Sequence, residues 1–100
     1  MEQLDFLDTP WETVTEDMAN SFQKELINEL GEAHILYKKS ATALAHRIDN
    51  DDVIFWINEL EKYAIVHLTW SKYNSSGYPR TEFFSLEVLR VHCKTASDFY

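Results

Sequence analysis

The spacing of apolar residues predicts an amphipathic helix that begins near Thr15 and ends at Leu30. One side of this helix carries an apolar residue at every fourth position: Met18, Phe22, Leu26 and Leu30. Either Thr13 or Thr15 can cap its start, and Gly31 follows its end as a natural helix breaker. The opposite side carries three acids, Glu25, Glu29 and Glu32. We therefore expect this helix to present an acidic surface.

Alternating, β-branched and aromatic residues predict strands farther along the chain. The segments Val53 to Ile57 and Tyr63 to Trp70 are separated by a short polar stretch of hairpin length, so we expect them to pair antiparallel. After a turn-rich stretch, a third short strand is expected around Arg80 to Phe84, followed by one or two helical turns from Ser85 to about Cys93. Residues 34–48 fit both a helical stripe and a strand, and the pattern leaves both possibilities open.

The alternation also indicates which strand faces are buried. Ala64, Val66, Leu68 and Trp70 share one face of the second strand, and we expect that face, including Trp70, to pack in the core. Trp56 lies opposite Val53, Phe55 and Ile57, so one large apolar face of the first strand is expected to be partly uncovered. An incompletely covered aromatic face is a candidate protein contact.

All of the net charge lies in the first third of the chain. Residues 1–33 carry nine acids against Lys24 alone, whereas residues 34–100 carry eight acids and eight bases. Such a concentration of negative charge favours a basic protein partner and repels nucleic acid and anionic membranes.

The composition fits one α+β domain over residues 1–100, with residues 1–10 and 94–100 expected to be loose. Cys93 is the only cysteine and the acidic start does not resemble a signal peptide, so we expect a reducing, cytoplasmic compartment. The longest apolar run is far too short for a membrane segment. We expect no cofactor, since two glycines provide neither a P-loop nor a dinucleotide-binding motif.

The acidic run from Asp49 to Asp52 does not fit a calcium loop. Counted from Asp49, the fifth and sixth positions are Val53 and Ile54, where oxygen ligands and a glycine would be needed. We interpret the run as a solvated turn.

The four histidines have no zinc-ligand spacing, and we expect no metal site. An acid–base ribonuclease could be assembled from His34, His67, Tyr37 and Arg80. These residue types are too common for their presence to be evidence of a ribonuclease, and the negative charge of the chain would repel RNA. A lone histidine in a strand is more often packed or hydrogen-bonded, so we expect no enzyme.

The chain resembles a group of small bacterial proteins, some of which are similar to immunity proteins of toxin–immunity pairs, including contact-dependent growth inhibition systems. Four segments carry the resemblance: His34 to Tyr37, Asp51 to Phe55, Tyr63 to Trp70 and Pro79 to Phe84. It covers about residues 11–85, and its most specific part is the run His67-Leu68-Thr69-Trp70, followed by Pro79 and Phe83-Phe84. After Phe84 the chain departs from the expected pattern.

The resemblance implies an α+β domain with an antiparallel sheet, which favours a strand within residues 34–48. The apolar pattern adds an N-terminal helix and a short C-terminal helix. We therefore expect a sheet of three to four strands packed with these two helices. The implied function is neutralisation of a cognate bacterial toxin, a nuclease, by binding through an acidic surface. The partner-binding residues that we predict are Glu25, Glu29, Glu32, Asp49, Asp51 and Asp52, with Trp56 or Tyr78 as the apolar anchor.

Three other functions stay open at this point, one of which is a structural or adaptor domain that would form a homo-oligomer with no toxin gene beside it. A phage or mobile-element inhibitor could mimic nucleic acid with regularly spaced carboxylates and capture a DNA-binding protein. A small hydrolase using His67 with Arg80 is the less favoured alternative. Loss of turnover in His67→Ala with an intact fold would support the hydrolase.

Overall fold

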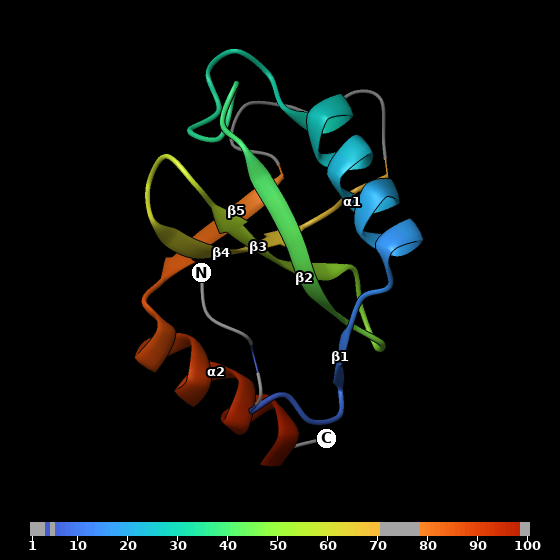
Figure 1. Ribbon diagram of the computed structural model, residues 1–100, viewed down its shortest axis with the longest axis vertical. Coiled ribbons are helices and arrows are strands. Elements are labelled where there is room, and N and C mark those ends of the chain that lie inside the picture. Colours follow the sequence, from blue (N-terminus) through green and yellow to red (C-terminus); the bar gives the residue numbers. More distant parts are fainter. Residues whose placement is uncertain (1–3, 5, 71–78, 99–100) are drawn as a thin grey trace.

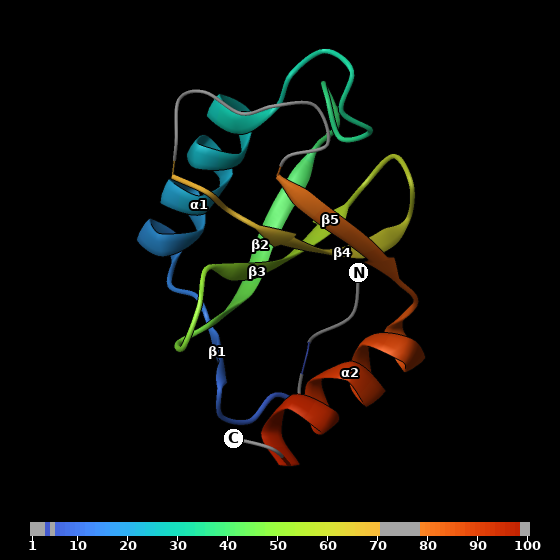
Figure 2. The ribbon, with the colours of Figure 1, turned by 180° about the vertical axis from the view of Figure 1, so that it is seen from behind.

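The computed structural model describes residues 4, 6–70 and 79–98, in which five strands and two helices follow one another along the chain. They are β1 (Trp11–Thr13), α1 (Glu16–Glu29), β2 (Ala41–Arg47), β3 (Asp52–Ile57), β4 (Lys62–His67), β5 (Arg80–Phe84) and α2 (Leu86–Asp98). The strands form a single antiparallel sheet in the order β1-β2-β3-β4-β5. The two helices lie on opposite sides of this sheet (Figures 1 and 2). The α+β class is confirmed, and the sheet has five strands where three to four were expected.

The additional strand is β1, which runs along the outer side of β2. It is only three residues long, with Trp11 opposite Arg47 and Thr13 opposite Ala45. Three residues are too few for a two-residue period to stand out, and therefore the alternation did not predict it. Burial of the Trp11 side chain, 2 % exposed, anchors this edge of the sheet.

α1 begins and ends close to the predicted positions. Thr15 is the N-cap, and its hydroxyl oxygen accepts a hydrogen bond from the Met18 N–H at 3.2 Å. Leu30 ends the helix in an extended conformation while its N–H still bonds the carbonyl of Leu26. Gly31 does not adopt the left-handed conformation that makes glycine a common terminator.

Residues 34–48 contain a strand, as the resemblance implied. β2 occupies Ala41–Arg47 and pairs with β3, with a shift in register between Ala43 and Ala45. The preceding residues form successive turns, in which the N–H groups of His34 and Tyr37 bond carbonyls three residues back.

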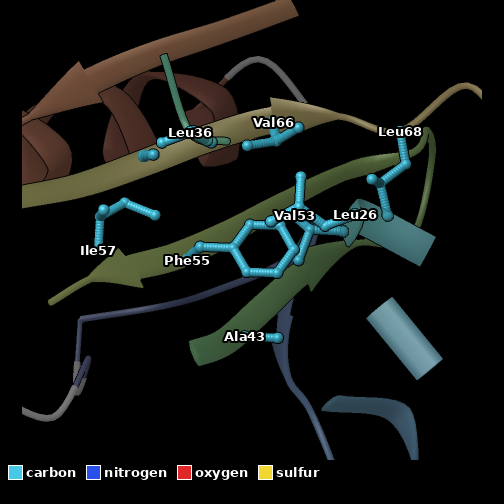
Figure 3. Packing of buried hydrophobic residues seen from close by; sticks show 9 residues of the cluster. Leu26, Leu36, Ala43, Val53, Phe55, Ile57, Val66 and Leu68 are labelled. Atoms are coloured by element: carbon cyan, nitrogen blue, oxygen red, sulfur yellow. The ribbon is translucent and has the colours of Figure 1, made fainter. Parts of the chain in front are cut away.

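The first core lies between the sheet and α1. Its buried members come from α1, the turns after it and strands β2 to β4: Leu26, Leu36, Ala43, Val53, Phe55, Ile57, Ala64, Val66 and Leu68. Figure 3 shows these side chains gathered over one face of the strands. Full burial of a leucine or phenylalanine side chain stabilises a fold by about 1.5–3 kcal/mol, so this layer supplies much of the driving force for folding.

The second core lies on the opposite face, between the sheet, α2 and the N-terminal segment. Its buried members are Leu4, Trp11, Ala45, Ile54, Tyr63, Ile65, Leu89 and Cys93. Both faces of β3 and β4 are therefore covered, and the hydrophobic runs in these strands reflect two-sided burial. The expected loose tail from Lys94 is helical as far as Asp98, and Leu4 and Pro10 are buried in the N-terminal segment. Within the described part of the chain, neither helix is long and apolar enough to cross a membrane.

Candidate functional site

Glu29 is buried, contrary to the expectation that it lies on the exposed side of α1. Its side chain is 4 % exposed. One carboxylate oxygen accepts hydrogen bonds from the Thr69 N–H and hydroxyl, both at 2.8 Å, and the other accepts the Trp70 N–H at 2.9 Å. Glu29 therefore holds the chain just after β4, and its carboxylate is not available to a partner.

Glu25 lies one turn before Glu29, and their carboxyl groups are hydrogen-bonded to each other. The hydrogen bond to Glu29 is the main cause that raises the pKa of Glu25 to about 7, and burial adds to the effect. Burial works to raise the pKa of Glu29, but hydrogen bonds from Glu25, Thr69 and Trp70 outweigh it and hold that pKa below its ordinary value. Near neutral pH, Glu25 therefore carries only part of a negative charge.

Trp70 is exposed, so the prediction that it packs in the core is wrong. Its side chain is 52 % exposed, and its backbone has a left-handed φ of 55°. Such a conformation is strained for a bulky residue and persists only where surrounding contacts enforce it. The bond from the Trp70 N–H to Glu29 is one such contact, and the edge-on packing of Phe22 against the indole, 6.3 Å between ring centroids, is a second.

A shallow hollow of about 220 Å³ lies beside Trp70. It is lined by Phe22, His46, Asn50, Asp51, Asp52, Val53 and Trp70. Glu12 on β1 adds a carboxylate 3.9 Å from Nε2 of His46. We call the group Glu12, Phe22, Glu25, His46, Asp51 and Trp70 the acidic aromatic surface.

The predicted acidic run between β2 and β3 divides into three different roles. Asp49 forms a two-pronged ion pair with Arg47, at 2.8 and 2.7 Å, and this hydrogen-bonded pair lowers the pKa of Asp49. Asp51 is exposed beside Trp70. Asp52 accepts a hydrogen bond from Nδ1 of His67 at 2.8 Å on the other side of the sheet. Of the three acids, Asp51 is the one that is exposed at the hollow and forms part of the acidic aromatic surface.

Of the two predicted anchors, Trp56 does not lie on this surface. Trp56 is partly buried against the second core, and its ring meets Tyr63 edge-on at 5.0 Å. Tyr78 lies outside the described residues. Glu32 is exposed just beyond the end of α1.

A larger cleft of about 720 Å³ lies on the α2 side of the sheet. Its lining residues are Asp52, Ile65, His67, Arg80, Thr81, Glu82 and His92. His34 and Tyr37, the other members of the ribonuclease set considered above, do not line it. Nε2 of His34 instead bonds the Pro79 carbonyl at 3.0 Å, while its Nδ1 accepts the Leu36 N–H. No group of three or more metal-ligating side chains within residues 4, 6–70 and 79–98 is arranged to hold a metal ion.

Sequence reasoning missed the roles of Glu29, Phe22, His46 and Trp70. Glu29 and Thr69 are forty positions apart, so no local pattern connects them. One signal was present: Trp70 ends an apolar alternation immediately before a stretch rich in turn residues, where a strand face often leaves the core.

Comparison with protein-family models, curated protein sequences and solved structures gives no match to this chain.

Proposed function

We propose that this chain is an immunity protein that neutralises a cognate bacterial toxin, a nuclease, by binding it through the acidic aromatic surface. The partner would be a protein with a basic surface, such as the groove in which a nuclease holds phosphates. The mode of action is occupation of that groove in a one-to-one complex, without bond-making by this chain.

The observation that carries the proposal is the exposed Trp70, whose backbone N–H is bonded by Glu29 and whose ring contacts Phe22. Tryptophan is among the residues that most often dominate the binding energy of protein interfaces. Because Glu29 and Phe22 already fix its backbone and ring, little conformational freedom is lost when a partner covers it. A strained, exposed aromatic residue supported by a buried carboxylate is difficult to explain as packing alone.

Electrostatics supports a basic partner. Asp51 lines the hollow beside Trp70, Glu12 lies 3.9 Å from Nε2 of His46 in the same hollow, and Glu16 and Asp17 are exposed in the first turn of α1. A field of this kind speeds encounter with a positively charged protein and weakens as salt is added. The family resemblance of the sequence supports the same assignment.

Mimicry of nucleic acid is less well supported. That function requires regularly spaced carboxylates on one surface, whereas Glu29 is buried, Asp49 is paired with Arg47 and Asp52 is paired with His67. The predicted acids thus form no continuous row.

The proposal is tested by calorimetric titration of the purified chain with the protein encoded by the adjacent open reading frame. We expect a one-to-one complex in which Trp70→Ala raises Kd roughly thirty-fold, equivalent to about 2 kcal/mol. Ile27→Ala is the matched control, because Ile27 is 72 % exposed but lies on the other side of α1. Absence of a complex, or equal Kd values for the two variants, would contradict the proposal.

Charge reversal provides a second arm of the experiment. The double variant Glu12→Lys/Asp51→Lys is compared with Glu61→Lys/Glu87→Lys, since all four residues are exposed and the net charge changes equally. At low salt we expect the association rate constant to fall more than about ten-fold in the first variant and only slightly in the second. Equal reductions would show that net charge, and not this surface, guides the encounter.

A further inference from the structure

We propose that the cleft on the α2 side of the sheet is a binding site for a small phosphomonoester, meaning a phosphate group carried by a hydroxylated molecule such as a sugar phosphate. This inference is independent of the immunity role, because the cleft opens on the opposite side of the sheet from Trp70. Failure of one proposal therefore leaves the other standing.

The register of the sheet brings the polar residues of the cleft together. Asp52, His67 and Arg80 are direct partners in one row across β3, β4 and β5. The adjacent row on the same side contains Ile54 and Ile65, which are buried in the second core against α2. The Asp52 row thus lies where the apolar layer ends and a cleft opens to solvent.

Asp52 sets the orientation of His67. A carboxylate is a hydrogen-bond acceptor only, so the 2.8 Å contact requires that Nδ1 of His67 carry the proton. Asp52 is itself held by Asn50, whose side-chain oxygen accepts the Asp52 N–H at 2.8 Å. The opposite ring nitrogen, Nε2, is directed away from Asp52, and His67 is exposed to the cleft.

Two further cationic or hydrogen-bonding side chains line the same space. Arg80 is exposed on β5, and its planar guanidinium can bind two phosphate oxygens at once. His92 enters from α2 and is held by the Phe84 ring, 5.1 Å between ring centroids. His67, Arg80 and His92 can each donate hydrogen bonds to an oxyanion in the cleft, which the carboxylates of Asp52 and Glu82 also line.

The remaining lining residues favour an esterified phosphate with a hydroxylated carrier over the free ion. The cleft volume of about 720 Å³ exceeds what one phosphate needs and falls within the range of small-molecule sites, roughly 300–1,000 Å³. Glu82 supplies acceptor oxygens suited to ligand hydroxyl groups, and Ile65 supplies an apolar wall. All of these residues belong to residues 34–100, where acids and bases balance.

The test is a titration followed by NMR of the histidine ring nitrogens, with ribose 5-phosphate and inorganic phosphate as probes at constant ionic strength. We expect the signals of His67 and His92 to move along one saturable curve, with Kd for ribose 5-phosphate of about 1 mM or lower. Inorganic phosphate should bind roughly ten-fold more weakly, because it lacks the hydroxyl contacts.

Arg80→Gln should raise Kd for ribose 5-phosphate about ten-fold or more, whereas Arg90→Gln, an exposed arginine on α2 that does not line the cleft, should leave it unchanged. The amide spectrum of each variant checks its fold, and His67→Gln replaces Arg80→Gln if that variant unfolds. Four results would each overturn the proposal: no saturable shift, shifts reproduced by sodium chloride, equal binding of the two probes, or equal Kd values for Arg80→Gln and Arg90→Gln.

Discussion

The carboxylate of Glu29 accepts the backbone N–H of Trp70 at 2.9 Å, and this contact links a buried residue of α1 to an exposed aromatic residue. Glu29 is buried within the last turn of α1, while Trp70 follows the end of β4. The helix therefore determines the backbone position of a residue that lies on the surface. The surface that we propose for partner binding is thus positioned by contacts within the fold.

Replacement of Glu29 by alanine is expected to lower the free energy of unfolding by about 3 kcal/mol. Hydrogen bonds to a charged group contribute about 1.5–3 kcal/mol, and the partly buried donors of Thr69 and Trp70 lose their acceptor. Urea denaturation measures the change. Glu32→Ala is the control, since Glu32 is exposed and its loss should cost no more than about 0.5 kcal/mol. Similar costs for both variants would mean that Glu29 does not stabilise the fold.

The Glu25–Glu29 pair should make stability depend on pH. Because the pKa of Glu25 is raised from 4.5 to about 7, the folded protein binds more protons at this site than the unfolded chain between those values. Its contribution to the free energy of unfolding therefore falls as pH rises from 4.5 to about 7. Glu29 has a lowered pKa, so its contribution is lost only as the pH falls below 4.5.

The measurement is urea denaturation of wild type and Glu25→Gln between pH 4.5 and about 7. Glutamine keeps a hydrogen-bond donor toward Glu29 and does not titrate. We expect the variant to gain stability relative to wild type as the pH rises through this window. If the free energy of unfolding changes with pH in the same way for both proteins, Glu25 and Glu29 do not share a proton.

Two neighbouring residues of α2 should differ sharply in how much they contribute to stability. Leu89 is fully buried against the sheet, whereas Val88 is 55 % exposed. Leu89→Ala should cost about 2–5 kcal/mol because it leaves a cavity, and Val88→Ala should change stability by about 0.5 kcal/mol or less. Thermal or chemical denaturation compares the two. If both variants are equally stable, α2 does not pack as described.

The Cys93 thiol should be inert in the native protein. It is 1 % exposed, and burial raises its pKa to about 12, so almost none of it is thiolate at neutral pH. Labelling with a thiol-specific reagent should be slow in buffer and rapid in denaturant. Labelling in buffer at the rate of the unfolded chain would contradict its burial in the second core.

The features that were predictable from the sequence are those with a long enough local pattern. α1, β3 and β4 are long enough for a repeating pattern of apolar residues to be recognised. β1, with three residues, is too short for such a pattern. The site depends instead on distant partners. Asp52, His67 and Arg80 meet because the strand registers align them, and the backbone N–H of Trp70 is bonded by Glu29, forty-one positions earlier.

The most direct test of the account is hydrogen–deuterium exchange of the complex with the protein encoded by the adjacent open reading frame. If a partner binds the acidic aromatic surface, new protection should appear in three segments that are separate in sequence but lie together around Trp70: the Phe22 turn of α1, residues 50–53 and residues 69–70. Unchanged exchange in these segments, with protection confined to α2 and the cleft beside it, would contradict the account.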